Sequence, residues 1–323
     1  MRIFLIASLL LFNACTAEVD ELSLSDRYVM FTLNTQEFIY LDECVETVNR
    51  VIDIHEEYQV PVDIYLTEDI IRDYETSAPE LIERLKESDM VAVSYHTRPP
   101  RPYNLAAYDF IGMDELPPDE LYETLLDYEE HAVDRETGET TEDEGGYEHV
   151  KEVIGYAPIV VGMPIGIEEK EMRNALAEIY KQKGATFVVM HRDVDLGEQH
   201  YGFFVRPEHI EVKLFEHVGE DAVSLIETLW EESTFPTPTF MSIKVHDNDF
   251  IATASAWTSI YLKQKPPYDL ERGKTERELL SEEESREMWT LYEDSVKYVS
   301  EHPELYTAIN AFDLSALLKE TAP

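Results

Sequence analysis

The sequence contains little cysteine, and this limits the chemistry available to it. Only Cys15 and Cys44 occur among its 323 residues. If Cys15 carries a lipid, Cys44 has no partner for a disulfide, and no disulfide framework supports the fold. A metal site made of cysteines is excluded as well. Any metal held by this protein must therefore be bound by His, Asp and Glu side chains.

Positive charge is also scarce. The chain has 26 Lys and Arg residues against 68 Asp and Glu residues, which gives a formal net charge of -42. Such an acidic surface repels nucleic acid and anionic lipid headgroups, so we expect neither as a partner. The charge could serve a dedicated cationic ligand or solubility in a salty medium, where screening makes a dense acidic surface tolerable. We favour the second interpretation.

The first 26 residues are expected to lie outside the fold. Arg2 precedes an apolar run from residue 3 to residue 12, which is typical of a secretory signal and too short for a membrane span. The sequence FNAC, which ends at Cys15, resembles a bacterial lipobox, whose cysteine becomes the lipidated first residue. Residues 1–14 would then be a lipoprotein signal peptide and residues 15–26 a flexible acidic tether. The alternative is a soluble secreted protein cleaved nearby.

Segments typical of strands and helices alternate along the rest of the chain. This alternation predicts an α/β fold with parallel strands and helices outside them, either a closed or nearly closed barrel or a doubly wound open sheet. Residues 27–323 would form one domain, with an acidic insertion at about 104–155 that holds one helix and an exposed turn. The expected strands cover residues 27–34, 60–67, 90–96, 156–166, 185–191, 210–216, 240–246 and 306–312.

Imidazoles and carboxylates follow several of the expected strands. The first strand ends with Asn34 and Glu37, the third with His96, and two later ones run into the sequences HRDVD and HDNDF. Ligand sites of parallel α/β folds lie at the carboxyl ends of the strands, so these side chains would share one edge. Together they could hold a divalent metal such as Zn²⁺, which supports hydrolytic chemistry. Each of them could also be an ordinary polar loop residue.

These segments resemble the NodB-like polysaccharide deacetylases of carbohydrate esterase family 4. The resemblance rests on the sequences FTLNTQEF, VSYHTRPPRPY and IKVHD and on the C-terminal stretch VKYVSEHPELYTAINAFDL, and it covers most of residues 27–318. It implies a deformed (β/α) barrel, an Asp–His–His metal triad, an Asp base near the first strand and a late His that acts as general acid. The glycan substrate would lose an acetyl group by hydrolysis of an acetamide or ester.

The chain departs from this pattern at several positions. Asn34 stands where the family has its catalytic base, and Pro100 where it has its second metal-binding His. His246 alone matches cleanly, as the general acid. The metal would then be held by Glu37, His96 and a residue of the HRDVD segment, for which we select His191. Asp247 or Asp193 would have to replace the missing base.

Other side chains near these motifs could bind a glycan. Arg98 and Arg101 are rare cations that could pair with an anionic group, although they could equally pair with neighbouring acids. Tyr103 and Trp257 could stack on sugar rings or simply pack in the interior. We add Asn34 to this predicted substrate-binding set.

Three functions remain open from the sequence. The first is an envelope lipoprotein on the periplasmic or cell-surface side, which touches the membrane only through lipid on Cys15. It would hydrolyse acetyl groups of a polysaccharide with a divalent metal, for which we select Zn²⁺. The second is a catalytically inactive barrel that binds glycan, which Asn34 and Pro100 favour. The third is a glycosidase with paired carboxylates, for which no pair can be selected.

Overall fold

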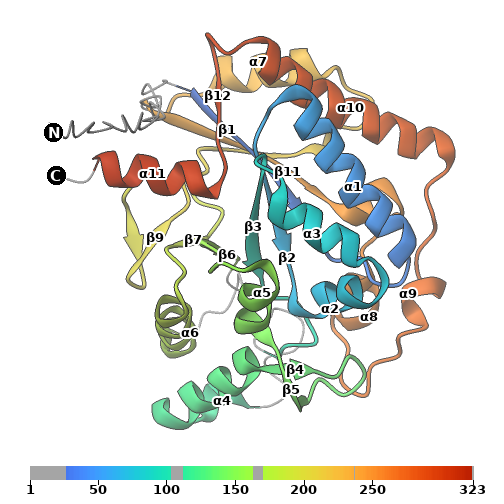
Figure 1. The fold of residues 1–323 in the computed structure, drawn as a ribbon, viewed down its shortest axis with the longest axis vertical. Helices are drawn as coiled ribbons and strands as arrows, with labels where there is room; N and C mark the ends of the chain where they lie inside the picture. The colour runs from blue at the N-terminus through green and yellow to red at the C-terminus, as the bar shows by residue number, and fades with distance from the viewer. Residues whose placement is uncertain (1–26, 103–111, 163–169, 236, 322–323) are drawn as a thin grey trace, which may run out of the picture.

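A curled, mostly parallel sheet surrounded by helices forms the centre of the protein (Figure 1). The computed structural model describes residues 27–102, 112–162, 170–235 and 237–321. The strands of this sheet are β1 (Arg27–Asn34), β2 (Val62–Leu66), β3 (Val91–His96), β6 (Val160–Gly162), β7 (Phe187–Val189), β8 (Gln199–His200), β9 (Phe203–Val205), β10 (Ile210–Lys213), β11 (Thr239–His246) and β12 (Thr307–Ala308).

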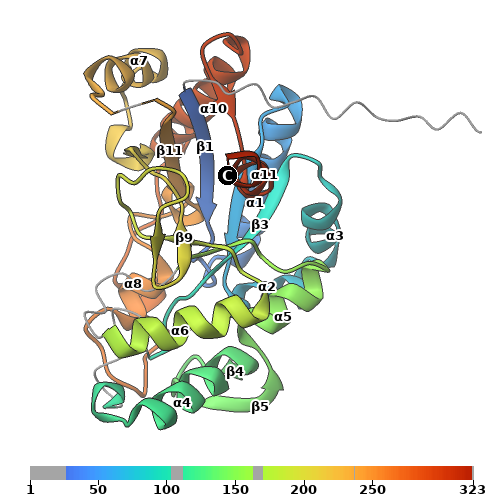
Figure 2. The ribbon, with the colours of Figure 1, turned by 90° about the vertical axis from the view of Figure 1, so that its left-hand side faces the viewer.

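The strands follow the order β10-β11-β1-β2-β3-β6-β7-β9-β8, with β12 beside the start of β1. All of the pairs are parallel except β8 with β9. The sheet curls around a common interior, as the turned view shows (Figure 2). Over the described residues it is an open path and therefore a half-barrel. This confirms the α/β class predicted from the alternating segments and the deformed barrel that the resemblance implies.

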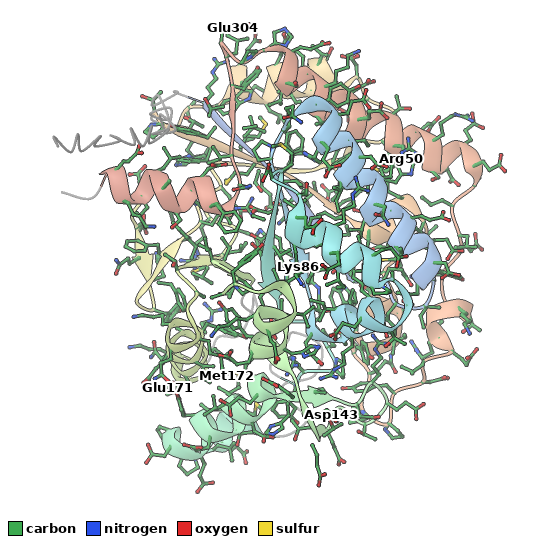
Figure 3. The ribbon with its side chains drawn as sticks, viewed as in Figure 1. Arg50, Lys86, Asp143, Glu171, Met172 and Glu304 are labelled. Atoms are coloured by element: carbon green, nitrogen blue, oxygen red, sulfur yellow. The ribbon has the colours of Figure 1, made fainter. Side chains whose placement is uncertain are left out.

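The helices lie around this sheet. Their bounds are α1 (Leu41–Tyr58), α2 (Glu68–Ser77), α3 (Pro79–Glu87), α4 (Pro118–Glu130), α5 (Gly146–Ile154), α6 (Lys170–Lys183), α7 (Ala222–Glu232), α8 (Ala256–Tyr261), α9 (Arg272–Thr275), α10 (Glu282–Glu301) and α11 (Ala311–Thr321). Among these residues no helix is long and apolar enough to span a membrane. Figure 3 draws the side chains around them, with Arg50 on α1, Lys86 on α3 and Glu171 on α6.

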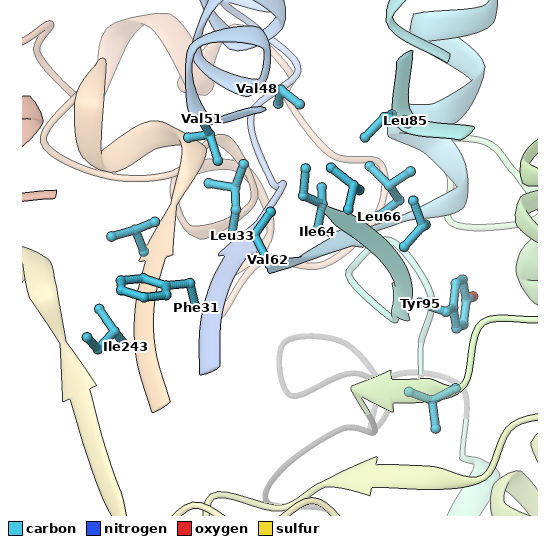
Figure 4. Packing of buried hydrophobic residues seen from close by; sticks show 14 of the residues in the cluster. Phe31, Leu33, Val48, Val51, Val62, Ile64, Leu66, Leu85, Tyr95 and Ile243 are labelled. Atoms are coloured by element: carbon cyan, nitrogen blue, oxygen red, sulfur yellow. The ribbon is translucent and has the colours of Figure 1, made fainter. Parts of the chain in front are cut away.

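Side chains alternate between the two faces of each strand, because successive residues of a strand point to opposite sides. On β1, Phe31 and Leu33 point outward and pack beneath α1 residues such as Val48 and Val51 (Figure 4). Tyr28 and Met30 point into the half-barrel instead. Full burial of one such side chain stabilises the fold by about 1.5–3 kcal/mol.

The interior of the half-barrel is filled only at the amino ends of the strands. There the inward side chains of β1, β7 and β11 pack with α11, which contributes Leu314 and Leu317. The helix is fixed at its start by the Ala311 N–H, which donates to the Asp63 carboxylate at 2.8 Å. Toward the carboxyl ends the inward positions become polar, from Thr32 and Asn34 on β1 to Lys244 and His246 on β11. The fold therefore places a polar interior at one end of the half-barrel.

The acidic insertion has more structure than the sequence predicts. It contains the expected helix α4, but also an antiparallel hairpin of β4 (His131–Val133) and β5 (Thr140–Glu144), followed by α5. The prediction of an exposed turn is thus correct only for the residues between the two strands, where Asp134 Oδ1 accepts the Thr137 N–H at 2.8 Å. Strand β5 has no apolar alternation because its residues are almost all exposed. A strand without a buried face leaves no periodic signal in the sequence.

Candidate functional site

A cavity of about 410 Å³ opens at the carboxyl ends of the strands, and we call it the mouth cavity. Its volume is in the range of small-molecule sites. Inward-facing residues at or just beyond the strand ends line most of it. The lining residues are Thr32, Asn34, Tyr65, His96, Arg98, Val189, His191, Arg206, Glu211, Lys213, Phe215, Lys244 and His246.

Five of the predicted site residues line the mouth cavity: Asn34, His96, Arg98, His191 and His246. Asn34 and His246 are register partners on the neighbouring parallel strands β1 and β11, which places them side by side. His96 ends β3, on the other side of β2. The expectation that residues 96 and 246 share one end of an α/β body therefore agrees with the structure. Their chemical roles remain predictions.

His246 is oriented by a carboxylate that the sequence-based site omits. Asp249 Oδ2 accepts the His246 main-chain N–H at 2.6 Å and lies 3.1 Å from the ring Nδ1. The ring also packs against Phe215, with 5.3 Å between ring centroids. A carboxylate on Nδ1 fixes the orientation of an imidazole and leaves Nε2 for a ligand. Asp249 is three residues after His246 in HDNDF, and this spacing is the signal that could have identified it.

His96 is held as a neutral ring. Its Nδ1 lies 2.7 Å from the Thr97 carbonyl oxygen, which makes Nδ1 the protonated nitrogen and leaves Nε2 as an acceptor. Burial, and then the Arg98 guanidinium, hold the pKa of His96 well below its usual range. The ring fits against the neighbouring strand only because residue 162 is glycine: a Cβ there would be 2.7 Å from the His96 Cδ2.

His191 belongs to a charged network with residues that the sequence reasoning did not select. Its Nδ1 lies 2.8 Å from Lys244 Nζ, 3.0 Å from Glu211 Oε1 and 3.2 Å from Glu208 Oε2. Burial alone would lower the pKa of His191, but the hydrogen bonds to Glu208 and Glu211 outweigh it and raise that pKa. Lys244 donates to Glu211 Oε1 at 2.6 Å. Glu211 is therefore already bound to a cation, whereas Glu208 has only ion-pair contacts, with His191 and with Arg206.

Arg206 forms the floor of the mouth cavity and is another residue that the sequence reasoning did not select. Its side chain is 1% exposed, and its two terminal nitrogens donate to the Tyr65 hydroxyl and to Thr32 Oγ1, both at 2.8 Å. A carboxylate oxygen of Glu208 is 3.8 Å away. The strand period could have identified several of these residues. Glu211 and Lys213 alternate on β10, and Lys244 precedes His246 by two residues, so each pair shares a face.

Glu37 is not brought to the mouth cavity. Its carboxylate, 0% exposed, forms a bidentate ion pair with Arg277 and accepts the N–H groups of Ile39 and Tyr40 at the start of α1. These partners occupy both carboxylate oxygens of Glu37. The predicted metal set of Glu37, His96 and His191 is therefore not assembled, because a turn after β1 directs Glu37 toward the loop that precedes α10.

Asp247 also points away from the mouth cavity. It follows the inward-facing His246, so its side chain is buried on the opposite face, where it accepts the N–H groups of Gln36, Glu37 and Asn248. Cys44 Sγ lies 2.9 Å from Oδ2. Burial raises the pKa of Asp247 to about 7. This carboxyl group ties β11 to the turn after β1, and this geometry does not suit the predicted base.

The remaining predicted residues are dispersed. Asp193 is exposed and Arg101 is buried in an ion pair with Glu68 at 3.1 Å, so neither lines the mouth cavity. The Trp257 indole lies against Arg98: the guanidinium carbon is 5.1 Å from the ring centroid. Tyr103 and Cys15 lie outside the described residues. The expected pairing of arginine with acids thus holds for Arg101 but not, within the described residues, for Arg98.

The donor set of the mouth cavity does not suit a divalent metal. In the described part of the chain, no group of three His, Cys, Asp or Glu side chains could hold a metal ion. The described lining residues include four cationic side chains but only one carboxylate, that of Glu211, which Lys244 already binds. Ammonium and guanidinium groups beside the imidazoles repel a cation. We therefore assign no metal-dependent step to these residues.

Comparison with known proteins finds similarity in fold. No protein-family model and no curated protein matches this sequence. The 4-alpha-glucanotransferase from Thermococcus litoralis is similar with a TM-score of 0.50 and 12% identity, over 90% of this chain and 40% of that chain. This protein thus spans well under half the length of that enzyme.

Two further solved structures have lower scores. The peptidoglycan deacetylase PdaC from Bacillus subtilis has a TM-score of 0.44 and 12% identity, over 91% of this chain and 92% of its own. A CE4 family pseudoenzyme from Bacillus anthracis has a TM-score of 0.35 and 9% identity, over 82% of this chain and 60% of its own. Identities this low transfer no residue roles, so the function must be argued from the mouth cavity itself.

Proposed function

We propose that this protein is a deacetylase-like glycan-binding protein of the bacterial cell envelope that holds its ligand in the mouth cavity without metal-dependent hydrolysis. One observation carries the proposal. The strand ends bring Asn34, His96 and His246 together, as the resemblance requires, but the groups beside them are cations rather than the carboxylate and second histidine of a metal triad. The envelope location, with lipid on Cys15, is supported by the pattern of residues 1–15 alone.

The lining suits a sugar. The imidazoles of His96 and His246 each have one nitrogen held by the protein and the other left for a ligand, so they can accept from or donate to hydroxyl groups. The half-buried Phe215 supplies a ring surface next to these polar groups. Sites for small molecules combine apolar walls with a few fixed polar groups in this way.

The test combines binding with hydrolysis. Purified protein is titrated by calorimetry with neutral N-acetylglucosamine oligomers and with uronate-containing oligosaccharides, and acetate release from acetylated glycans is measured with and without Zn²⁺. We expect saturable binding of at least one glycan class, weakened in His246→Ala and unchanged in the surface control His217→Ala, with no acetate released. Acetate release that requires metal and is lost in His96→Ala would overturn the proposal, as would the absence of binding to every glycan.

Hydrolysis by the same mouth cavity is a second candidate, and the His246–Asp249 pair favours it. An imidazole fixed by a carboxylate is the arrangement of a general acid or base. The missing part is a base, since Asn34 cannot accept a proton usefully and Asp247 faces away. Acetate release that continues in EDTA and disappears in His246→Ala would establish this candidate in place of the first.

A further inference from the structure

The mouth cavity is positive in a strongly negative protein. Among the described residues its lining contains Arg98, Arg206, Lys213 and Lys244 and one carboxylate, that of Glu211, in a chain with 26 basic and 68 acidic residues. Basic residues are rare enough that four around one cavity are not explained by composition. A concave site lined by one sign of charge concentrates ligands of the opposite sign.

Most of this positive charge already has a partner. Lys244 is paired with Glu211 at 2.6 Å, and Arg206 has Glu208 at 3.8 Å in addition to its hydroxyl acceptors. Lys213 is at the rim, 46% exposed, with Glu216 at 3.9 Å. These groups organise the mouth cavity, and each has a carboxylate nearby.

Arg98 is different. Within the described residues no carboxylate lies within 4.0 Å of its guanidinium, and its buried Nε has no hydrogen-bond partner. The Trp257 ring covers one face of the guanidinium at 5.1 Å. Burial lowers the pKa of Arg98 to about 10, so the group still carries its charge at neutral pH. Arg98 is half-buried, and its buried Nε lacks an acceptor, which is costly unless a ligand supplies one.

The neighbours of Arg98 indicate which anion would suit it. His96 beside it donates from Nδ1 to the Thr97 carbonyl oxygen and presents Nε2 as an acceptor, so the guanidinium of Arg98 supplies the positive charge there. A planar guanidinium binds a carboxylate through two parallel hydrogen bonds, which matches a singly charged planar anion better than a doubly charged tetrahedral one. The ring nitrogens of His96 and His246 lie around the same cavity and would meet hydroxyl groups.

We propose that the mouth cavity recognises the carboxylate of an acidic sugar residue, with Arg98 as its ion-pair partner and with the positive lining replacing the metal of the resembled family. This inference rests on the proposed glycan-binding function and names the class of glycan. Here the Arg98 guanidinium would bind the ligand, whereas the resembled family uses a metal ion to activate water. A cavity that binds its ligand through arginine does not need the acidic donors of a metal triad.

The experiment compares a glucuronate trisaccharide with the glucose trisaccharide of the same linkage, by calorimetry at low and moderate salt. We expect the acidic sugar to bind at least about tenfold more tightly, since a charge-assisted hydrogen bond to a desolvated group has this effect on affinity. Arg98→Gln should remove most of the difference, with a much smaller loss of affinity for the neutral sugar. Arg286→Gln, on the exposed face of α10, is the matched control and should change nothing.

A second variant keeps the test informative if Arg98→Gln does not fold. Lys213→Gln changes a rim side chain and should weaken only the acidic sugar, by about two- to fivefold, because its charge is more exposed to screening. Equal affinity for the two sugars, or an equal loss for both in Arg98→Gln, would overturn the carboxylate assignment while leaving glycan binding intact. A sugar phosphate that binds more tightly than the uronate would overturn it too. Failure of both sugars to bind would remove the proposed function as well.

Discussion

Lys213 of β10 and Lys244 of β11 are register partners on adjacent parallel strands, and both side chains line the mouth cavity. Like charges in paired positions of a sheet are destabilising unless something compensates them. For Lys244 the compensation is Glu211, at 2.6 Å, on the same strand as Lys213. The pairing therefore holds positive charge at the carboxyl end of the half-barrel, where a ligand would enter.

Replacing Glu211 should lower the stability of the protein and at the same time strengthen its binding of acidic glycans. In Glu211→Gln, the buried Lys244 and the half-buried His191 lose a negative partner, so we expect the free energy of unfolding to fall by about 1–3 kcal/mol. The affinity for an acidic oligosaccharide should rise, because the one carboxylate among the described lining residues is gone. Thermal unfolding and calorimetry measure the two effects. Glu216→Gln, at the exposed rim, should show neither; an acidic ligand that binds more weakly to Glu211→Gln would contradict this account.

The ion pair of Glu37 with Arg277 should be structural. Both side chains are fully buried, and removal of one partner leaves an uncompensated charge. We expect Glu37→Gln to lower the free energy of unfolding by about 3–5 kcal/mol, measured by urea denaturation. Where the variant remains folded, its glycan affinity should match that of the wild type. A variant of unchanged stability that loses bound metal would show instead that Glu37 is a ligand.

Much of this arrangement was predictable from the sequence, and the exceptions have a common cause. The strand ends and their histidines follow from local patterns, and the period-two alternation of residues 210–216 already places Glu211 and Lys213 on one face. Glu37 and Asp247 were assigned by proximity along the chain to Asn34 and His246. Their partners are Arg277, 240 residues away, and the Gln36 N–H, 211 residues away. Contacts at such separations leave no local pattern.

Space for His96 depends on Gly162. These residues are register partners on β3 and β6, and a Cβ at position 162 would meet the His96 ring. Gly162→Ala should displace the ring, weaken glycan binding about tenfold and destabilise the fold by about 1–3 kcal/mol. In a His96→Ala background the same substitution should cost little, because the clash is gone. Additive losses in this double-mutant cycle would show that the glycine acts through another contact.

A pH-dependent loss of stability should arise from His55, outside the mouth cavity. Its ring is fully buried between the Val60 carbonyl and the Tyr292 hydroxyl, and burial lowers its pKa to about 4. The unfolded chain takes up the proton near pH 6.5, before the folded one does. The contribution is therefore complete above pH 6.5 and is lost as the pH falls toward 4, by about 3 kcal/mol in all.

Urea denaturation between pH 7 and pH 4 measures this effect. His55→Gln should be less stable at pH 7 but should lose less of its stability on acidification than the wild type does. The surface variant His217→Gln should follow the wild type. Parallel curves for the wild type and His55→Gln would mean that the buried ring does not resist protonation.

The mouth cavity is proposed, above all, to hold a charged glycan without metal. The decisive measurement is the affinity of the purified protein for the glucuronate trisaccharide, determined once in excess EDTA and once with saturating Zn²⁺. We predict equal dissociation constants under the two conditions and intact sugar at the end of both titrations. Binding that appears only with Zn²⁺, or release of acetyl groups from an acetylated analogue in its presence, would contradict the account.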